Sequence, residues 1–469
     1  MNNSANLIRR GKIDTRFYKD SLCLIPYVVF SFLALLSTVH CVFSAFNFIL
    51  CILYILFYKK DKTIPFLIYV TYFASIFKIL EITEISLYTL LLFVFVIKEV
   101  HQRKFKIKFL ISLVILATFV ISIDLVKGPV NISRCIKFFE FFFYIYIVID
   151  TYFDSESQLE CSSMLKAVIF GVIISSTFRF LDSNIFNISK FVGEKYSLYE
   201  ESVFTRFSGL LGDPNYFAVN VFVAIVSTLF LGCKKKIPYV CMLLILLTLV
   251  GLAVLTGSKS AILMLVLPFV LLLYVNVKLK LGKLNIALLI GTAVCLIIII
   301  SLKSDYFSYI LLRFTSSELS IDLLTTGRTA IWRDYSAYFN SNLLNLVFGS
   351  GISALPLNGY AAHNTYFDIL YYLGIIPGIV YSYLIVRYFF YKRIDIKRSI
   401  LNFSGIIVVL TMYSFLSSLF DIDLGTNIIV GIILFNTCLD NAENNIKKSN
   451  VVILRENDNF EVKNTNTSF

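Results

Sequence analysis

Residues 237–255 have the sequence IPYVCMLLILLTLVGLAVL, which is nineteen residues long and carries no charge. A helix needs about 20 such residues to cross the hydrocarbon core of a bilayer. Similar runs recur along the chain, since 58% of its 469 residues are hydrophobic and the mean hydropathy is +0.80. Only 15% of the residues are charged, against about 25% in soluble domains. The sequence therefore predicts a protein that crosses a membrane many times.

Apolar segments long enough to be candidate spans occur at fourteen places. They lack the polar–apolar alternation of barrel strands, so we expect helices. Several limits are soft and the turns near residues 40, 82 and 422 are tight. The expected fold is therefore an all-α polytopic membrane protein with about 12–14 transmembrane helices. The candidate spans are residues 22–39, 41–58, 64–80, 82–98, 107–126, 132–149, 164–181, 212–232, 237–255, 258–276, 284–302, 364–391, 400–420 and 424–439.

Lysine and arginine predict the orientation, because they concentrate in cytoplasmic loops. With the N-terminus in the cytoplasm, 28 of the 42 basic residues lie inside and ten lie outside. Residues 150–163, nominally inside, have none. The net charge of +12 is then mostly a topological signal and does not indicate nucleic-acid binding. The expected order is a cytoplasmic segment (1–21), a bundle (22–302) with an outer loop (182–211), a large extracytoplasmic loop (303–363) before the twelfth span, further spans (364–439) and a disordered cytoplasmic tail (440–469).

The longest polar interruption of the bundle runs from Lys303 to His363. It ends in AAHNTY, residues 361–366, directly before another apolar run. Long loops of this kind commonly carry function. In the predicted topology it faces outward together with 182–211 and the short turn at 256–260. We therefore expect three polar segments that are distant in sequence to converge on the outer face.

The first of these segments contains RFSGLLGDPN, residues 206–215. Asp213 is predicted to be a helix N-cap, with Pro214 at the first helical position. The simpler interpretation is a capped helix entry with Arg206 extending to lipid headgroups. In the second segment, Lys259 can hold a phosphate as a point charge, or it can anchor the membrane interface.

The third segment is the long loop itself, in which GRTAIWRDY, residues 327–335, predicts a helix near the membrane surface. Trp332, Tyr335 and Phe339 share one face of that helix at helical spacing. Such a stripe packs against an interface more often than it binds a sugar. Arg328 follows a glycine that lets the backbone approach closely, so it is the better functional candidate.

His363 is the strongest single candidate for a functional residue in the loop. A structural role is the simpler interpretation of a lone histidine. Here, however, Asn364 can cap the following helix, and a helix N-terminus disfavours the imidazolium ion. We therefore expect a neutral side chain that can accept a proton.

The helices expected after these three segments all point their N-termini outward. A helix N-terminus presents N–H groups and partial positive charge, which suit an anion. Together with the basic residues Arg206, Lys259 and Arg328, this predicts a site for a strongly negative group such as pyrophosphate. Arg134 and Arg179, near the outer ends of their spans, can widen it. The sequence has no HExxH, paired-cysteine or nucleotide-binding motif, so no cofactor or metal is expected.

The ordered set of motifs resembles the O-antigen polymerase/ligase superfamily, bacterial membrane enzymes that act on polysaccharide carried by undecaprenyl pyrophosphate. The resemblance covers residues 206–378. Lys259 departs from it, because arginine is frequent there and a lysine lacks the bidentate fork. The matching residues are Arg206, Gly209, Asp213, Pro214 and Asn215; GSKSA at 257–261; Gly327, Arg328, Trp332 and GSG at 349–351; and HNTY at 363–366, Leu370 and GIIPG at 374–378.

The resemblance implies a glycosyltransferase whose donor is a glycan on undecaprenyl pyrophosphate and whose acceptor is a sugar hydroxyl. His363 would be the general base, an effect worth about 10²–10⁴-fold. Arg206 and Arg328 would stabilise the departing pyrophosphate, and inversion at the anomeric carbon is implied. Asp213 is an alternative base. The residues expected to bind substrate are Lys259, Asp213, Asn215, Asn364, Tyr366, Trp332, Arg134 and Arg179.

Three functions fit these expectations. The leading one is a Wzy-type polymerase of O-antigen or capsule repeat units in the bacterial inner membrane, with its active site facing the periplasm and a chain-length regulator as a possible partner. The second is the ligase that moves finished glycan to lipid A core. The third is a flippase for the same lipid-linked unit, although a transporter more often shows repeated halves and has no need of the long outer loop.

Overall fold

The computed structural model describes the greater part of the chain. The N-terminal segment 1–21, the predicted span 284–302, Gly327 and the tail after residue 439 lie outside the described residues, as do about half of the span at 258–276 and the first part of the long loop. The described residues are 24–78, 86–102, 105–153, 159–183, 185–192, 196–199, 202–261, 264–266, 268, 270–271, 328–389, 400–417, 419 and 425–436.

Apart from one short hairpin, the regular secondary structure of the described residues is helical, which confirms the all-α class. The first half contains α2 (Ile25–Ser37), α3 (Cys41–Phe57), α4 (Lys60–Val70), α5 (Leu87–Gln102), α6 (Ile107–Lys127), α7 (Ile132–Phe153), α8 (Cys161–Phe180), α9 (Ser189–Val192), β1 (Tyr196–Tyr199), β2 (Ser202–Thr205), α10 (Pro214–Cys233) and α11 (Tyr239–Leu255). The second half contains α16 (Arg328–Ser341), α17 (Leu343–Phe348), α18 (Thr365–Asp368), α19 (Ile375–Leu384), α20 (Ile400–Phe415) and a last helix, Gly425–Asn436.

Three of the described helices, α6, α8 and α10, are long and apolar enough to cross a membrane. Six shorter apolar helices accompany them in the described part of the chain. On α6 the side chains of Val114 and Leu125 are 63% and 67% exposed. Apolar residues that face outward along an apolar helix are expected in contact with lipid, not water. The helices thus have the character of a membrane protein.

Two predicted spans differ in detail. In the segment 64–80, α4 contains Pro65 and ends at Val70, where a 3₁₀ turn, Thr71–Phe73, follows it. The segment 364–391 is interrupted at Gly374, whose φ of +75° ends one helix and begins the next. A π-helical turn, Ile369–Leu373, precedes this glycine.

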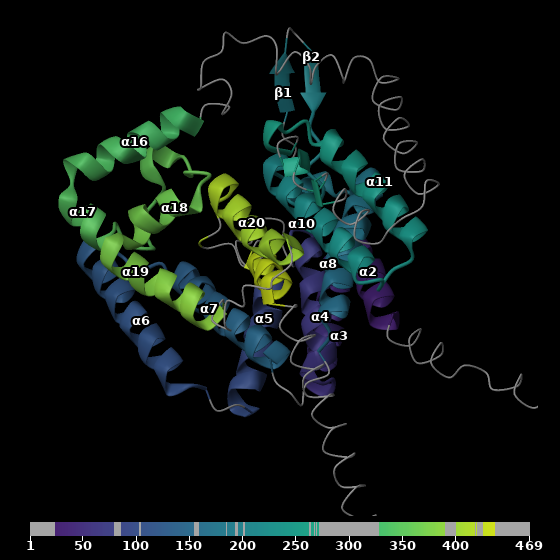
Figure 1. The fold of residues 1–469 in the computed structure, drawn as a ribbon, viewed down its shortest axis with the longest axis horizontal. Coiled ribbons are helices and arrows are strands. Elements are labelled where there is room, and N and C mark those ends of the chain that lie inside the picture. Colours follow the sequence, from purple (N-terminus) through teal and green to yellow (C-terminus); the bar gives the residue numbers. More distant parts are fainter. Residues whose placement is uncertain are drawn as a thin grey trace, which may run out of the picture.

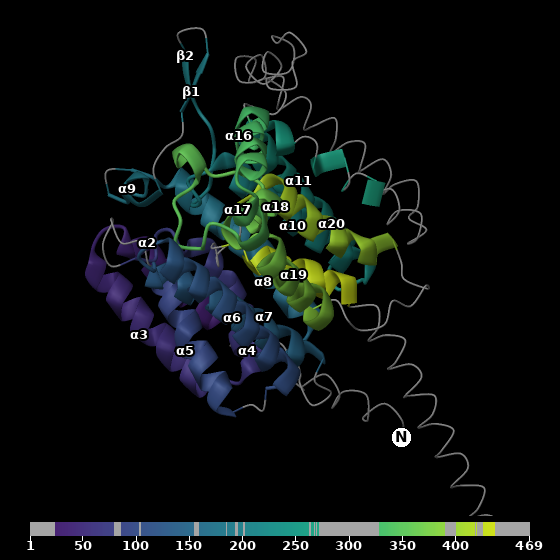
Figure 2. The same cartoon turned by 90° about the vertical axis from the view of Figure 1, so that its left-hand side faces the viewer.

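The segment 182–211, which we expect to be an outer loop, also contains structure that the sequence did not predict. Its strands β1 and β2 pair antiparallel, with Tyr196 opposite Thr205 and Tyr199 opposite Ser202. Figure 2 shows this hairpin projecting from the helices at the end of the molecule where α16 lies. The hairpin leads directly into Arg206, so it precedes the first of the predicted site motifs.

Helix α10 occupies the middle of the fold and packs against α8, α11 and α20 (Figure 1). All of its residues are buried except Asn215 and Tyr216. Deeper in the helix, Asn220 accepts a hydrogen bond from the side-chain amide of Asn427 on the last helix. The first turn of α10, with Asn215 and Tyr216, is therefore the part of the helix that is accessible to solvent.

Helices α16 to α19 form a second group that lies beside α6 (Figure 1). α17 and α6 both pack against α19, while α18 packs against α20. Because α20 also packs against α10, it connects this group of helices with α10 and its neighbours α8 and α11. The start of α18 and the start of α10 are thereby brought to the same region.

Candidate functional site

The entry of α10 is capped as predicted. The carboxylate of Asp213 accepts a hydrogen bond from the backbone N–H of Asn215 at 2.8 Å, and Pro214 is the first helical residue. The chain arrives through Gly212, whose φ is +71°. A Cβ at this glycine would lie 2.5 Å from the backbone oxygen of Val192 at the end of α9. Only glycine therefore permits this close approach.

Asn215 joins the first two predicted segments. Its side-chain oxygen accepts hydrogen bonds from Arg206 at 3.4 Å and from the hydroxyl of Ser258 at 2.7 Å. The Nε of Arg206 also donates to the backbone oxygen of Thr256 at 3.1 Å. Lys259 is half-buried and lies between Ser258 and Ser260, whose hydroxyls are hydrogen-bonded at 2.7 Å. Arg206 thus belongs to a polar network that also contains Ser258 and Ser260, the two residues that flank Lys259 in the sequence.

Arg328, the first residue of α16, is buried and only 8% exposed. Its guanidinium carbon lies 6.0 Å from the centroid of the Phe415 ring, at the end of α20. Burial lowers the pKa of this arginine, while the nearby Asp213 and Tyr216 oppose that shift. Because an arginine side chain keeps its proton in proteins, the site holds a buried positive charge that an additional anion can stabilise.

His363 lies against the same helix entry. Its ring meets that of Tyr216 edge-on, with the centroids 6.2 Å apart and an interplanar angle of 72°. The Nδ1 atom of His363 is buried. The backbone of this residue has a φ of +49°, a left-handed conformation that costs free energy for a residue other than glycine. Strain of this kind is found at functional sites more often than elsewhere.

The position of His363 is fixed from both sides. Before it, the indole N–H of Trp332 donates to the backbone oxygen of Ala362 at 2.8 Å. After it, the side-chain oxygen of Asn364 accepts hydrogen bonds from the backbone N–H groups of Tyr366 and Phe367 at 2.9 and 3.3 Å. The predicted N-cap role of Asn364 is therefore confirmed.

The aromatic stripe of α16 packs inside the protein. Trp332 and Phe339 stack on the ring of Phe367 at 6.0 and 6.3 Å, and Tyr335 meets it edge-on at 6.1 Å. The predicted shared face is thus confirmed. The partner of the stripe is α18 together with the π-helical turn that follows it. Arg328 lies one turn before Trp332 on this face, so the packing also sets the position of the arginine.

The GSG motif locks the end of the long loop onto the helix that follows His363. The backbone N–H groups of Ser350 and Gly351 donate to the carbonyls of Tyr371 and Tyr372 at 2.7 and 3.0 Å. A Cβ on Gly374 would lie 2.2 Å from the backbone nitrogen of Gly349. The glycines of this motif therefore serve a close backbone contact.

The other predicted residues have separate positions. Arg134 donates hydrogen bonds to the backbone oxygens of Ile352 and Ala354, and Arg179 forms an ion pair with Asp182 at 3.0 Å. These contacts hold loops in place. Whether the two arginines also widen an anion site stays a prediction. Tyr366 is 40% exposed and meets Tyr413 edge-on, so it is accessible near the site.

The segments distant in sequence meet at one place, residues 213–216, which we call the α10 entry. Asn215 contacts Arg206 and Ser258, whereas Tyr216 contacts His363 and interacts with Arg328. Sequence reasoning missed Tyr216 and Phe415. Tyr216 could have been found as an aromatic residue in the first turn of a capped helix, but nothing in the sequence marked Phe415.

Comparison of the chain with protein-family models, with curated proteins and with solved structures gives no match. The function therefore has to be argued from the α10 entry and its surroundings.

Proposed function

We propose that the protein is a polysaccharide polymerase that transfers glycan from an undecaprenyl-pyrophosphate carrier to a hydroxyl of a second lipid-linked repeat unit. The observation that carries the proposal is the meeting of Arg206, Arg328 and His363 around the α10 entry. Two cations and a histidine beside a long, outward-pointing helix N-terminus suit a reaction in which a pyrophosphate leaves and a hydroxyl loses its proton.

Each residue then has a defined role. His363 accepts the proton of the acceptor hydroxyl while its oxygen forms a bond to the anomeric carbon of the donor. The bond between that carbon and the pyrophosphate oxygen breaks, and negative charge grows on the leaving group. Arg328 and Arg206 stabilise this charge more strongly in the transition state than in the ground state. Lys259 adds a further positive charge beside the serines of the second segment.

The surroundings of Arg328 favour this role over a purely structural one. A guanidinium that is 8% exposed interacts more strongly with an anion than a solvated one does, because water screens it less. Asp213 attracts this charge, although it is also committed to capping α10. A pyrophosphate bound beside Arg328 therefore completes the neutralisation of a charge that is costly to bury alone.

The proposal includes the topology and location expected from the sequence. The protein has 12–14 spans in the inner membrane of a bacterium, and the α10 entry faces the periplasm. Activation of the sugar is complete before the lipid-linked unit arrives there. The reaction then needs no nucleotide sugar.

Glycan chain length on a gel tests the proposal, in a strain of the source organism that lacks the native gene. The variants are His363→Asn, Arg328→Gln and the matched control Arg333→Gln, an exposed arginine on the same helix. A polymerase gives a single repeat unit on the glycan acceptor in the first two variants and a full ladder in the control.

Other outcomes separate the alternatives. Complete loss of attached glycan, with polymer remaining on the lipid carrier, would identify a ligase that acts on lipid A core. Accumulation of the lipid-linked unit on the cytoplasmic side would identify a flippase. Full ladders from both His363→Asn and Arg328→Gln would refute the assigned mechanism.

A further inference from the structure

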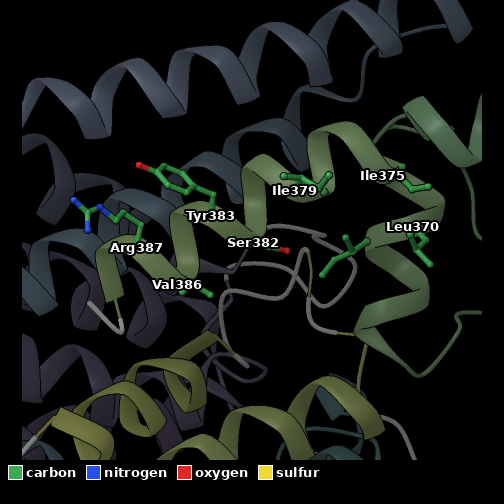
Figure 3. Close-up of a pocket in the computed structure, with 10 residues that line it drawn as sticks. Leu370, Ile375, Ile379, Ser382, Tyr383, Val386 and Arg387 are labelled. Atoms are coloured by element: carbon green, nitrogen blue, oxygen red, sulfur yellow. The ribbon is translucent and has the colours of Figure 1, made fainter. Parts of the chain in front are cut away.

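A groove of about 620 Å³ follows one side of α19 and of the π-helical turns at its two ends, Ile369–Leu373 and Ile385–Phe389 (Figure 3). The floor of the groove includes Gly378 and Ser382, which are four residues apart within α19 and therefore lie on one helix face. Gly374, at the start of α19, also lines the groove. Ile379 and Val386 border it and are 63% and 62% exposed.

The two ends of the groove differ in chemistry. Leu370 and Ile375 lie at one end, whereas Tyr383 and Arg387 lie at the other (Figure 3). The sequence beyond Arg387 continues with four more basic residues, Lys392, Arg393, Lys397 and Arg398. In the proposed topology this basic end is cytoplasmic. The groove is thus apolar along the membrane and positively charged where the cytoplasmic headgroups lie.

We infer that the groove binds one anionic phospholipid of the cytoplasmic leaflet. An acyl chain lies along the floor, and Arg387 donates hydrogen bonds to the phosphate, since its fork of N–H groups matches phosphate oxygens. The hydroxyl of Tyr383 offers a second donor at headgroup level, where tyrosine is enriched. The cytoplasmic leaflet supplies the anionic lipids, and its charge attracts basic residues near the surface.

Charge disfavours a second copy of the chain as the occupant. Small residues at four-residue spacing do form helix contacts in membranes. All copies have the same orientation, however, so a two-fold dimer about the membrane normal brings identical residues face to face. Arg387 would then approach Arg387 of the second copy, and like charges at close range destabilise the contact. A lipid phosphate has the opposite charge.

This inference rests on the orientation in the proposed function but not on its reaction. Native mass spectrometry of the purified full-length chain tests it, by counting lipids retained after extraction from nanodiscs. The two probes are phosphatidylglycerol and phosphatidylcholine with the same acyl chains. The variants are Arg387→Gln, which removes the charge, and Ser382→Leu, which fills the groove at an exposed position. Lys236→Gln, an exposed lysine on the same predicted side, is the matched control.

Wild type and Lys236→Gln should retain one phosphatidylglycerol in preference to phosphatidylcholine. Arg387→Gln should lower that preference about fivefold, the contribution of one basic residue near an anionic surface. Ser382→Leu should lower retention of both lipids. Equal retention of the two lipids by wild type would overturn the inference, as would equal losses in Arg387→Gln and Lys236→Gln. A dimer that Ser382→Leu disrupts would instead assign the groove to a second copy.

Discussion

The imidazole of His363 packs edge-on against the phenol ring of Tyr216, with the ring centroids 6.2 Å apart. Tyr216 is one of the two residues of α10 that are not buried, and it also interacts electrostatically with Arg328. The proposed base and the proposed cation therefore share one neighbour. Because that neighbour belongs to a helix held on all sides, the relative position of the two groups is set by the centre of the fold.

Replacing His363 with asparagine should slow transfer strongly while preserving the fold. Asparagine adopts the left-handed conformation more readily than most residues, so the φ of +49° is tolerated. The rate should fall by about 10²–10⁴-fold, the usual contribution of a general base. The measurement is turnover of a lipid-linked repeat unit by the purified protein, together with its thermal unfolding temperature.

The control for backbone strain is Asn358→Ala. Asn358 has a φ of +53° and is exposed, so alanine there should lower the unfolding temperature with little effect on turnover. An active His363→Asn protein would remove His363 from the mechanism.

Arg328→Lys should make activity depend on pH in a way that wild type does not. The burial that lowers the pKa of Arg328 acts on any cation at this position. Burial can lower the pKa of a lysine from about 10.4 to about 5–6. Lysine supports the reaction only when protonated, so its pKa must exceed the pH. The ratio of variant to wild-type rates should therefore rise as the pH falls from about 8 to about 6. Taking the ratio cancels the titration of groups common to both proteins. A flat ratio would contradict this role for the charge.

Arg206 and Asn215 should behave as a coupled pair. Asn215 accepts a hydrogen bond from the guanidinium, so Asn215→Ala leaves Arg206 less well positioned. Each single variant, Asn215→Ala and Arg206→Gln, should lower kcat/KM. The fold decrease in kcat/KM of the double variant should be smaller than the product of the two single fold decreases. Groups in contact show coupling of about 0.5–3 kcal/mol in such cycles. Additive losses would show that the contact does not serve catalysis.

Trp332→Phe should impair positioning of His363 while keeping the aromatic packing. Phenylalanine retains a ring against Phe367 but loses the hydrogen bond to the oxygen of Ala362. That bond is worth about 0.5–1.5 kcal/mol of stability, and a small misplacement of a reacting group can cost up to about 10²-fold in rate. We expect kcat to fall with KM nearly unchanged.

The control for the tryptophan is Tyr338→Phe on the same helix. It removes a hydroxyl that is hydrogen-bonded to the side chain of Ser350 at 2.9 Å. It should keep kcat near the wild-type value. A Trp332→Phe protein with wild-type kcat would mean that the indole only fills space.

Gly405→Ala should destabilise the contact between α20 and the last helix. A Cβ at Gly405 would lie 2.2 Å from the backbone oxygen of Gly431 and 2.5 Å from the backbone nitrogen of Phe435. Backbone atoms cannot move aside, and overpacking typically costs about 1–3 kcal/mol. Gly251→Ala on α11 is the control, because a Cβ there meets nothing within 4 Å. It should be neutral or stabilising by up to about 1 kcal/mol. Thermal unfolding in detergent distinguishes the two variants.

The sequence predicted the positions of most described helices well, because long uncharged apolar runs form helices in a membrane. It also predicted the caps at Asp213 and Asn364, since these side chains act on N–H groups two or three residues away. Both signals are local. The break at Gly374 was not predicted, and the backbone that lies closest to this glycine belongs to Gly349, 25 positions away in the sequence.

The individual residues of the candidate site could be predicted from the sequence, but their arrangement around the α10 entry could not. Arg206, Arg328 and His363 could be selected from composition and loop position. Their shared contact with the α10 entry depends on how α20 packs between two groups of helices. Phe415, which lies beside Arg328, is one of many phenylalanines in apolar runs, and nothing in its local sequence separates it from the others.

The near-complete burial of α10 makes the site sensitive to helical phase as well as to side-chain chemistry. Inserting one alanine after Ala224 turns everything before it by about 100° relative to everything after it. The residues after the insertion cannot follow, since α8, α11 and α20 pack against the helix. Asn215 and Tyr216 would then point away from Arg206 and His363 although every proposed functional residue is still present. In this helix the number of residues is itself a determinant of the geometry of the proposed site.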